Sequence, residues 1–291
     1  MKDSFAFFGT PYVARDTLAL LALRGFTPEV VITNPDAPRG RGYKLTASET
    51  KQWAVEHNLP VFTPSRLDKE AIEHIRAYGC AYAIVVAYGM IFPESLISIF
   101  PKGVLNIHYS LLPRYRGAAP VEAALLSGDS VTGVTVQMMA PALDAGDIIA
   151  QKKVAIDPHE TTKDLRPRLI TVGAELLAEI LPPFLRDEIT PVPQGHADAT
   201  YAGKLKKEDS LVDLSAPDRE NWNKYRAHAE WPGTYFFHPE RGRRVVEKGG
   251  KKMRVKITDA TLEKDGSFKI LKVIPEGRKE TAYDTFLNHT D

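Results

Sequence analysis

Short runs of β-branched and aromatic residues alternate with longer amphipathic stretches over the first two thirds of the chain. The runs predict strands over residues 4–8, 29–33, 81–87 and 104–108. In the stretches between them apolar residues recur at the helical period, which predicts helices over residues 14–23, 50–58 and 69–78. Helices that separate strands in this way connect parallel strands. We therefore expect a doubly wound α/β domain with a mostly parallel sheet.

A change in this pattern predicts a domain boundary. Two further strands, over residues 135–139 and 148–155, and a helix over residues 163–180 are followed by a segment rich in proline and glycine, which resists regular structure. Shorter apolar runs separated by glycine turns come next, as is typical of a small β domain. We expect a first domain over residues 1–181, a linker over 182–200, and a smaller C-terminal β-barrel (OB-like) domain over 201–291.

Composition and charge restrict the class of protein. The 291 residues are 43% hydrophobic and 26% charged, which are ordinary values for a globular protein. A single cysteine, Cys80, excludes an internal disulfide and a metal site made of several cysteines. The whole chain has a net charge of +1, whereas residues 201–291 carry 19 Lys and Arg against 15 Asp and Glu, a net charge of +4. A polyanionic partner must therefore meet a local basic surface.

The most basic segment lies within the C-terminal domain. Residues 241–256 contain eight Lys and Arg residues and one acid, Glu247. A strand pair there would gather the positive charge on one edge, where it could contact phosphates. The alternative is a solvated hairpin whose charges serve solubility.

Several classes of protein are disfavoured because their motifs are missing from the sequence. The turn after the first strand, at residues 8–11, lacks the second and third glycines of a dinucleotide site. The sequence contains no phosphate-binding loop of the Walker type, no G-x-S-x-G nucleophile elbow and no H-E-x-x-H pair. It also has neither a signal-peptide pattern nor an apolar run near the roughly 18 residues of a membrane helix. We expect a cytoplasmic protein without membrane contact.

One dense polar segment, residues 106–120, follows the fourth predicted strand. Asn106 and His108 are two positions apart, so their side chains project from the same face at the carboxyl end of the strand, where α/β sheets bind ligands. Their N–H groups could both donate to an oxyanion, and an imidazole can also move a proton near neutral pH. Asp144, on a glycine turn, could orient the histidine, with Asp147 as a competing candidate. The alternative is that Asn106 caps a turn, His108 is a core histidine with its hydrogen bonds satisfied, and Asp144 is an ordinary turn residue.

The segment resembles a known signature. The run Asn-Ile-His-x-Ser-Leu-Leu-Pro-x-Tyr-Arg-Gly-Ala-Ala-Pro and the later Leu-Asp-x-Gly-Asp resemble the 10-formyltetrahydrofolate-dependent formyltransferases. The resemblance implies that Asn106, His108 and Asp144 are catalytic, that 10-formyltetrahydrofolate is the formyl donor, and that no metal takes part. It also implies donor-binding residues in two segments, namely Ser110, Leu111, Leu112 and Pro113, and Tyr88, Gly89, Met90 and Ile91.

Within this family, the chain is most similar to members that formylate the methionine carried by charged initiator tRNA. The similarity includes residues 8–11, a basic loop at 35–45, and residues 200–208 and 231–236 of the C-terminal domain. It implies initiator methionyl-tRNA as partner and a set of basic residues that contact the tRNA: Arg39, Arg41, Lys44, Lys204, Lys206, Arg243, Arg244, Lys251 and Lys252. We expect a monomer.

Three other functions remain open. The same catalytic residues could formylate a small amine, such as a glycinamide ribonucleotide or an amino sugar. They could also hydrolyse formyltetrahydrofolate, with water as the acceptor. A non-catalytic RNA-binding protein on the same scaffold is a third alternative, against which the intact Asn106, His108 and Asp144 argue.

Overall fold

The computed structural model describes residues 4–39, 42–239 and 252–288, which form two compact units. Unit 1 comprises Met1–Pro120, Thr132–Val154 and Pro167–Tyr201, and unit 2 comprises Val121–Val131, Ala155–Arg166 and Ala202–Asp291. This division differs from the expected one, because two internal segments join the C-terminal residues. The expected linker over 182–200 belongs to unit 1, where Ile148 and Val192 exchange two backbone hydrogen bonds of 2.8 Å.

Unit 1 is built on one seven-stranded sheet of strand order β10-β9-β7-β6-β1-β2-β5. Its strands are β1 (Phe5–Gly9), β2 (Val30–Ile32), β5 (Val61–Phe62), β6 (Tyr82–Val86), β7 (Val104–His108), β9 (Val131–Met138) and β10 (Ile148–Ala155). The pairs from β5 to β7 are parallel, and β9 pairs antiparallel with β7. The expected doubly wound, mostly parallel sheet is confirmed.

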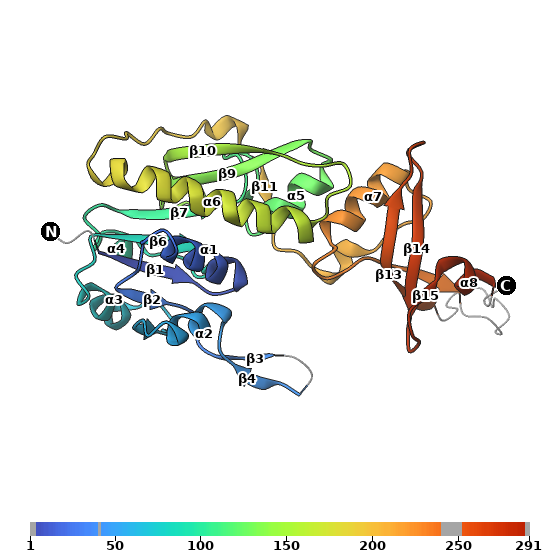
Figure 1. Ribbon diagram of the computed structural model, residues 1–291, viewed down its shortest axis with the longest axis horizontal. Coiled ribbons are helices and arrows are strands. Elements are labelled where there is room, and N and C mark those ends of the chain that lie inside the picture. Colours follow the sequence, from blue (N-terminus) through green and yellow to red (C-terminus); the bar gives the residue numbers. More distant parts are fainter. Residues whose placement is uncertain (1–3, 40–41, 240–251, 289–291) are drawn as a thin grey trace. The chain divides into compact units, whose positions relative to one another are not determined.

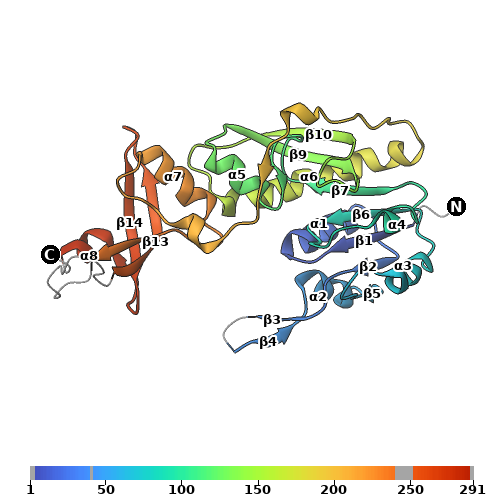
Figure 2. The ribbon, with the colours of Figure 1, turned by 180° about the vertical axis from the view of Figure 1, so that it is seen from behind.

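Helices cover both faces of this sheet, as Figures 1 and 2 show from opposite sides. On one face Phe8 of β1 packs with Ile75 of α3 (Lys69–Arg76) and Leu96 of α4 (Glu94–Ile97). On the other face lie α1 (Tyr12–Ala22), α2 (Glu49–Glu56) and α6 (Thr162–Leu185), and α6 meets β7 where Gly173 lies against Ile107. Burial on both faces explains why the strands are continuous apolar runs.

The sequence predicted β7 with its observed ends and most other elements of unit 1 to within a few residues. Two predictions were wrong. The basic loop expected at residues 35–45 instead includes the hairpin of β3 (Ala37–Arg39) and most of β4 (Lys44–Thr46). Helix α6 continues to Leu185, beyond the expected end at residue 180, and includes Pro182 and Pro183 in its last turn. The N–H groups of Arg186 and Glu188 donate to the carbonyls of these two prolines.

Unit 2 holds a four-stranded antiparallel sheet of order β12-β13-β14-β15. Its elements are α5 (Pro120–Leu126), α7 (Asp218–Ala227), β12 (Tyr235–Pro239), β13 (Lys252–Leu262), β14 (Phe268–Pro275), β15 (Thr281–Ala282) and α8 (Tyr283–Asn288). Its core groups Val255 of β13, Val273 of β14 and Phe286 of α8. The expected C-terminal β domain is confirmed. Its closure into a barrel stays a prediction, because β12 and β15, at the two edges of the described sheet, do not pair with each other.

Among the residues that the structure describes, no helix combines the length and the apolar character needed to cross a bilayer.

Candidate active site

Strand β7 positions the two residues that the signature singled out. Val104 of this strand packs in the core on the α3 and α4 side of the sheet. Side chains alternate between the two faces of a strand, so Asn106 and His108, two and four residues further on, face the same side as Val104. Both side chains are buried, with 8% of Asn106 and 5% of His108 exposed. The carboxyl end of β7 therefore presents an amide and an imidazole together, as predicted from their spacing.

Both nitrogens of the His108 ring face oxygen atoms. Nε2 lies 2.8 Å from the backbone carbonyl of Tyr115, and since a carbonyl can only accept, the proton resides on Nε2. Nδ1 lies 3.6 Å from Asp144 Oδ2. Tyr115 has a φ of 59°, in the left-handed region that few residues adopt, and a hydrogen bond of 2.8 Å from its N–H to Thr200 Oγ1 holds it there. The ring orientation is thus fixed from both ends.

Asp144 completes the group, and its carboxylate is held by hydrogen bonds from three elements. Oδ2 accepts from the Gly117 N–H at 2.7 Å, Oδ1 accepts from Gln137 Nε2 at 3.0 Å, and Asn106 Nδ2 is 3.5 Å from Oδ1. Asp144 has a φ of 46°, so the turn presents it in a strained conformation that these contacts maintain. The structure thus brings Asn106, His108 and Asp144 together.

The competing candidate, Asp147, lies elsewhere. It is exposed, and its backbone oxygen accepts from the Met138 N–H at 2.8 Å as the chain enters β10. Between the two acids stands Gly146, where an added Cβ would lie 1.8 Å from the Met138 carbonyl oxygen. Only glycine allows the turn to pass this close to β9, so Gly146 is part of what places Asp144 and not Asp147 beside the histidine.

The first predicted donor-binding segment, Ser110 to Pro113, forms a tight turn after β7. The Ser110 hydroxyl donates to the Arg114 carbonyl at 2.6 Å, and the Leu112 N–H donates to Thr135 Oγ1 at 3.1 Å. Ser110 and Leu112 are buried, whereas Leu111 and Pro113 are partly exposed. A ligand at this wall would therefore meet Leu111 and Pro113 first.

The second predicted donor-binding segment, Tyr88 to Ile91, divides between core and surface. The Tyr88 ring is 2% exposed and packs edge-on against Phe8 and Phe92, and its burial raises the pKa of the phenol. Gly89 is exposed, Met90 is partly exposed, and Ile91 is 88% exposed. The Tyr88 side chain therefore anchors the segment in the core, and Gly89 to Ile91 are the residues that a ligand can reach.

The predicted tRNA contacts are spread over both units. Lys44, Lys204 and Lys206 are exposed. The backbones of Arg39 and Lys252 lie in β3 and β13, respectively. The remaining four predicted contacts lie outside the described residues: Arg41, Arg243, Arg244 and Lys251.

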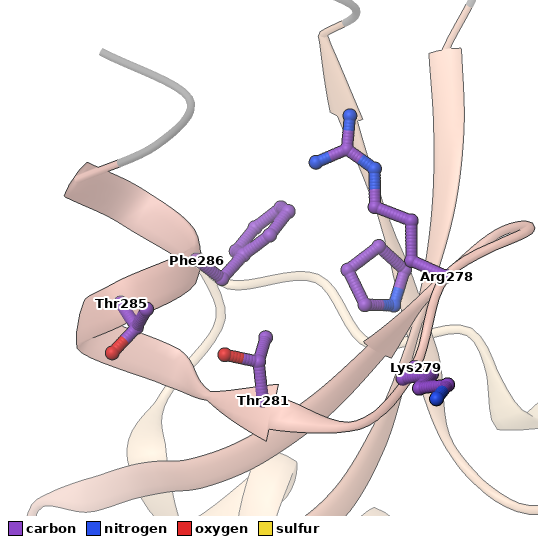
Figure 3. Close-up of a pocket in the computed structure, with 6 residues that line it drawn as sticks. Arg278, Lys279, Thr281, Thr285 and Phe286 are labelled. Carbon is purple, nitrogen blue, oxygen red and sulfur yellow. The ribbon is translucent and has the colours of Figure 1, made fainter.

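A pocket of about 230 Å³ lies in unit 2, apart from these residues. Figure 3 shows it between α8, which contributes Thr285 and Phe286, and the chain around Arg278, Lys279 and Thr281. The described residues that line it include none of the predicted site residues. It therefore adds no group to the arrangement around His108.

The arrangement can stabilise charge and move protons. Asn106 Nδ2 has two hydrogens, and its long contact with Asp144 uses at most one of them. The carboxylate of Asp144 faces the imidazole and can stabilise positive charge on it. Within residues 4–39, 42–239 and 252–288, no three His, Cys, Asp or Glu side chains are grouped as metal ligands would be.

Three residues that surround Asp144 were not predicted from the sequence. Gln137 donates to its carboxylate, Gln194 donates to its backbone carbonyl at 2.9 Å, and Arg116 binds Gln194. Arg116 lies within the signature, and only 3% of it is exposed. Its burial could not be predicted from the sequence, because a charged residue among turn residues is normally exposed. Gln194 fell in the expected linker, where no local pattern marks a buried amide.

Family models match almost the whole chain. The model described as "Formyl transferase" matches residues 4–181, and "Formyl transferase, C-terminal domain" matches residues 204–290. The chain belongs to the formyl transferase family.

Relatives within this family are similar over most of the chain. The methionyl-tRNA formyltransferase of Thermodesulfovibrio yellowstonii is 35% identical over 297 residues, covering 99% of this chain and 96% of that protein. The methionyl-tRNA formyltransferase of Pelobacter propionicus is 42% identical over 231 residues, covering 79% of this chain and 72% of that protein.

Solved structures share the fold at lower sequence identity. An N-formyltransferase from Helicobacter canadensis, in complex with folinic acid and dTDP-3-aminofucose, has a TM-score of 0.64 at 16% identity, covering 96% of this chain and 99% of that chain. The methionyl-tRNA formyltransferase from Clostridium thermocellum has a TM-score of 0.60 at 14% identity, covering 94% and 99%. At this identity the likeness concerns the fold alone.

Proposed function

We propose that this protein transfers a formyl group from 10-formyltetrahydrofolate to the α-amino group of methionine on charged initiator tRNA. The observation that carries the proposal is the convergence of Asn106, His108 and Asp144 at the end of β7. It occurs in a chain that aligns over 99% of its length with a methionyl-tRNA formyltransferase. Such an enzyme acts in translation initiation, and we propose that it does so in the cytoplasm as a monomer.

In this proposal the methionine amine attacks the formyl carbon of the folate. A carbon–nitrogen bond forms to the amine and an oxyanion develops on the formyl oxygen. The attacking nitrogen, positively charged after the attack, then gives up a proton to N10 of the folate, and the bond from the formyl carbon to N10 breaks. Asn106 donates an Nδ2–H to the oxyanion, and His108 adds the positive charge that its ring has once Nδ1, facing Asp144, has taken up the amine's proton. A preorganised donor of this kind lowers the barrier by roughly 3–4 kcal/mol.

Asp144 has a separate role in this proposal. The attacking amine must first lose the proton that it carries as an ammonium group, and the His108 and Asp144 pair lies where it can accept that proton through water. Asp144 also keeps the imidazole aligned, because its Oδ2 faces the ring at 3.6 Å. No covalent enzyme intermediate is needed.

The folate donor in this proposal binds against the two predicted donor-binding segments. Leu111 and Pro113 on one segment are partly exposed, and Gly89 to Ile91 on the other are exposed or partly exposed, so both segments present apolar surface suited to a pterin ring. The fold relative from Helicobacter canadensis contains folinic acid, a folate derivative, which supports a folate donor for this fold.

Fold alone does not separate the tRNA acceptor from a small amine, because the Helicobacter canadensis N-formyltransferase in complex with dTDP-3-aminofucose has a TM-score of 0.64. What favours tRNA is the alignment at 35% identity through both family domains and the exposed Lys44, Lys204 and Lys206.

A tRNA acceptor predicts a steep salt dependence of binding. If Arg39, Arg41 and Lys44 neutralise phosphates, replacing all three by alanine will weaken tRNA binding and flatten the plot of log Kd against log salt. The slope should fall by about 0.7–0.9 for each phosphate that the variant no longer neutralises. The measurement is tRNA binding across a salt series, with folate binding followed in parallel.

The chain offers a matched control. Arg66, Lys69 and Arg76 are also two arginines and one lysine, all exposed, on and before α3. Their replacement by alanine removes the same charge and should leave the slope unchanged. Equal slopes in the two triple variants would remove the electrostatic account and favour a small-amine acceptor.

A further inference from the structure

Gln194 is a buried amide in an otherwise exposed segment. Among residues 191–200, all of which the structure describes, it alone is buried, with 5% exposed. Figure 1 shows this segment, in gold, returning from the end of α6 along β10. A polar side chain is buried at such a place only where hydrogen bonds compensate its desolvation, so the contacts of Gln194 have to account for its position.

The amide nitrogen of Gln194 holds the turn that presents Asp144. Nε2 lies 2.9 Å from the Asp144 carbonyl oxygen and 2.7 Å from the Gly146 carbonyl oxygen, with Gln137 Oε1 further away at 3.2 Å. The two hydrogens of the amide match the two nearer carbonyls. These contacts span Ala145 and fix the backbone on both sides of it, at the point where Asp144 adopts its strained φ of 46°.

The amide oxygen of Gln194 ties this turn to the signature segment. Oε1 accepts from Arg116 Nε at 3.1 Å and from Arg116 Nη2 at 2.7 Å, and the guanidinium is buried. The next residue, Gly117, donates its N–H to Asp144 Oδ2. A closed circuit of hydrogen bonds and intervening backbone therefore links the Asp144 carbonyl, the Gln194 amide, Arg116 and Gly117, and the Asp144 carboxylate.

The same stretch of chain also supports His108. Thr200 Oγ1 accepts the Tyr115 N–H, and the Arg116 N–H donates to the Thr200 carbonyl at 2.8 Å. Since the Tyr115 carbonyl accepts from His108 Nε2, residues 194–200 brace the partners of His108 and of Asp144 at once.

We propose that Gln194 is a positioning residue for formyl transfer, which sets the distance between the Asp144 carboxylate and His108 Nδ1 through the circuit with Arg116. This inference rests on the proposed function, because it concerns the same reaction. Gln194 contacts the backbone on either side of Ala145, so it acts on the geometry of Asp144 and not by contact with the substrate. A displacement of about 1 Å in such a group can cost on the order of 100-fold in rate.

The test uses Gln194→Glu and Gln194→Met in the full-length protein. Glutamate keeps the oxygen that Arg116 binds but places a second oxygen against the Asp144 and Gly146 carbonyls. Methionine keeps the volume and removes both functions. We expect kcat to fall on the order of 100-fold in both variants, KM for donor and tRNA to change less than about threefold, and the pH–rate profile of kcat to shift its midpoint.

Asn221→Asp is the matched control. Asn221 of α7 is 2% exposed, and its Nδ2 donates to the carbonyls of Asp213 and Ala216, so this change also removes two buried amide donors. It should lower the unfolding temperature while leaving kcat and the pH–rate profile unchanged.

The outcomes separate this inference from the proposed function. A wild-type protein that transfers no formyl group to charged initiator tRNA contradicts the function itself. If the wild type is active, a folded Gln194 variant with wild-type kcat and pH–rate profile overturns the positioning role, as does a loss confined to KM. Failure of both variants to fold would make Gln194 a structural residue and also overturn it.

Discussion

Alanine in place of Asn106 is expected to lower kcat of formyl transfer by about 10²–10³-fold, because it removes an N–H donor aimed at the developing oxyanion. His108→Ala should have an effect of similar size. The donor acts on charge that exists only in the transition state, so the Kd of the folate should change by no more than a few-fold. Steady-state kinetics and folate titrations of the two variants measure these quantities.

The interpretation of these variants needs a folding control. Thermal unfolding of each variant shows whether the buried β7 end keeps its packing. His57→Ala removes an exposed imidazole that stacks on Trp53, far in sequence from the signature, and should retain wild-type kcat. Near wild-type turnover in folded Asn106→Ala or His108→Ala would remove that residue from the mechanism.

Asp144→Asn is expected to reduce kcat on the order of 10⁴-fold, as loss of a carboxylate that orients a catalytic histidine does in other enzymes. The change is nearly isosteric, but its new NH₂ group must face a donor, either the Gly117 N–H or Gln137 Nε2. It also removes the negative charge opposite His108 Nδ1. Turnover and the pH–rate profile of kcat are the measurements.

Asp147→Asn is the matched comparison for this prediction. The same chemical change three positions later affects an exposed side chain that lies away from the imidazole, so kcat should fall much less. A larger loss in Asp147→Asn than in Asp144→Asn would reverse the assignment of the carboxylate.

The sequence was most informative where local pattern and chemistry coincide. The residues of β7 form a short apolar run interrupted by Asn106 and His108, and the two-residue period of a strand was enough to put both side chains on one face. Local pattern left Asp144 and Asp147 as two candidates, and only the resemblance to the formyltransferases implied Asp144. The choice between them depends on the approach of Gly146 to Met138, which is a contact between residues of different elements.

Other features could not be predicted because they depend on tertiary contacts. Helix α7 has a polar sequence, and its buried Trp222 and Arg226 find partners in residues 125–158, so periodicity gives no strong signal. Pro217 and the acids of its first turn were the available signs of a helix start. The burial of Gln194 likewise follows from backbone carbonyls far away in the sequence.

The central claim is that the group around His108 formylates methionine on charged initiator tRNA. The most direct measurement is one transfer reaction with 10-formyltetrahydrofolate in which charged initiator tRNA, a glycinamide ribonucleotide and water compete as acceptors. The account predicts that the formyl group appears on the methionyl-tRNA and that donor consumption without tRNA is slow. Formyl transfer to the ribonucleotide, or donor consumption at the same rate when water is the sole acceptor, would contradict it.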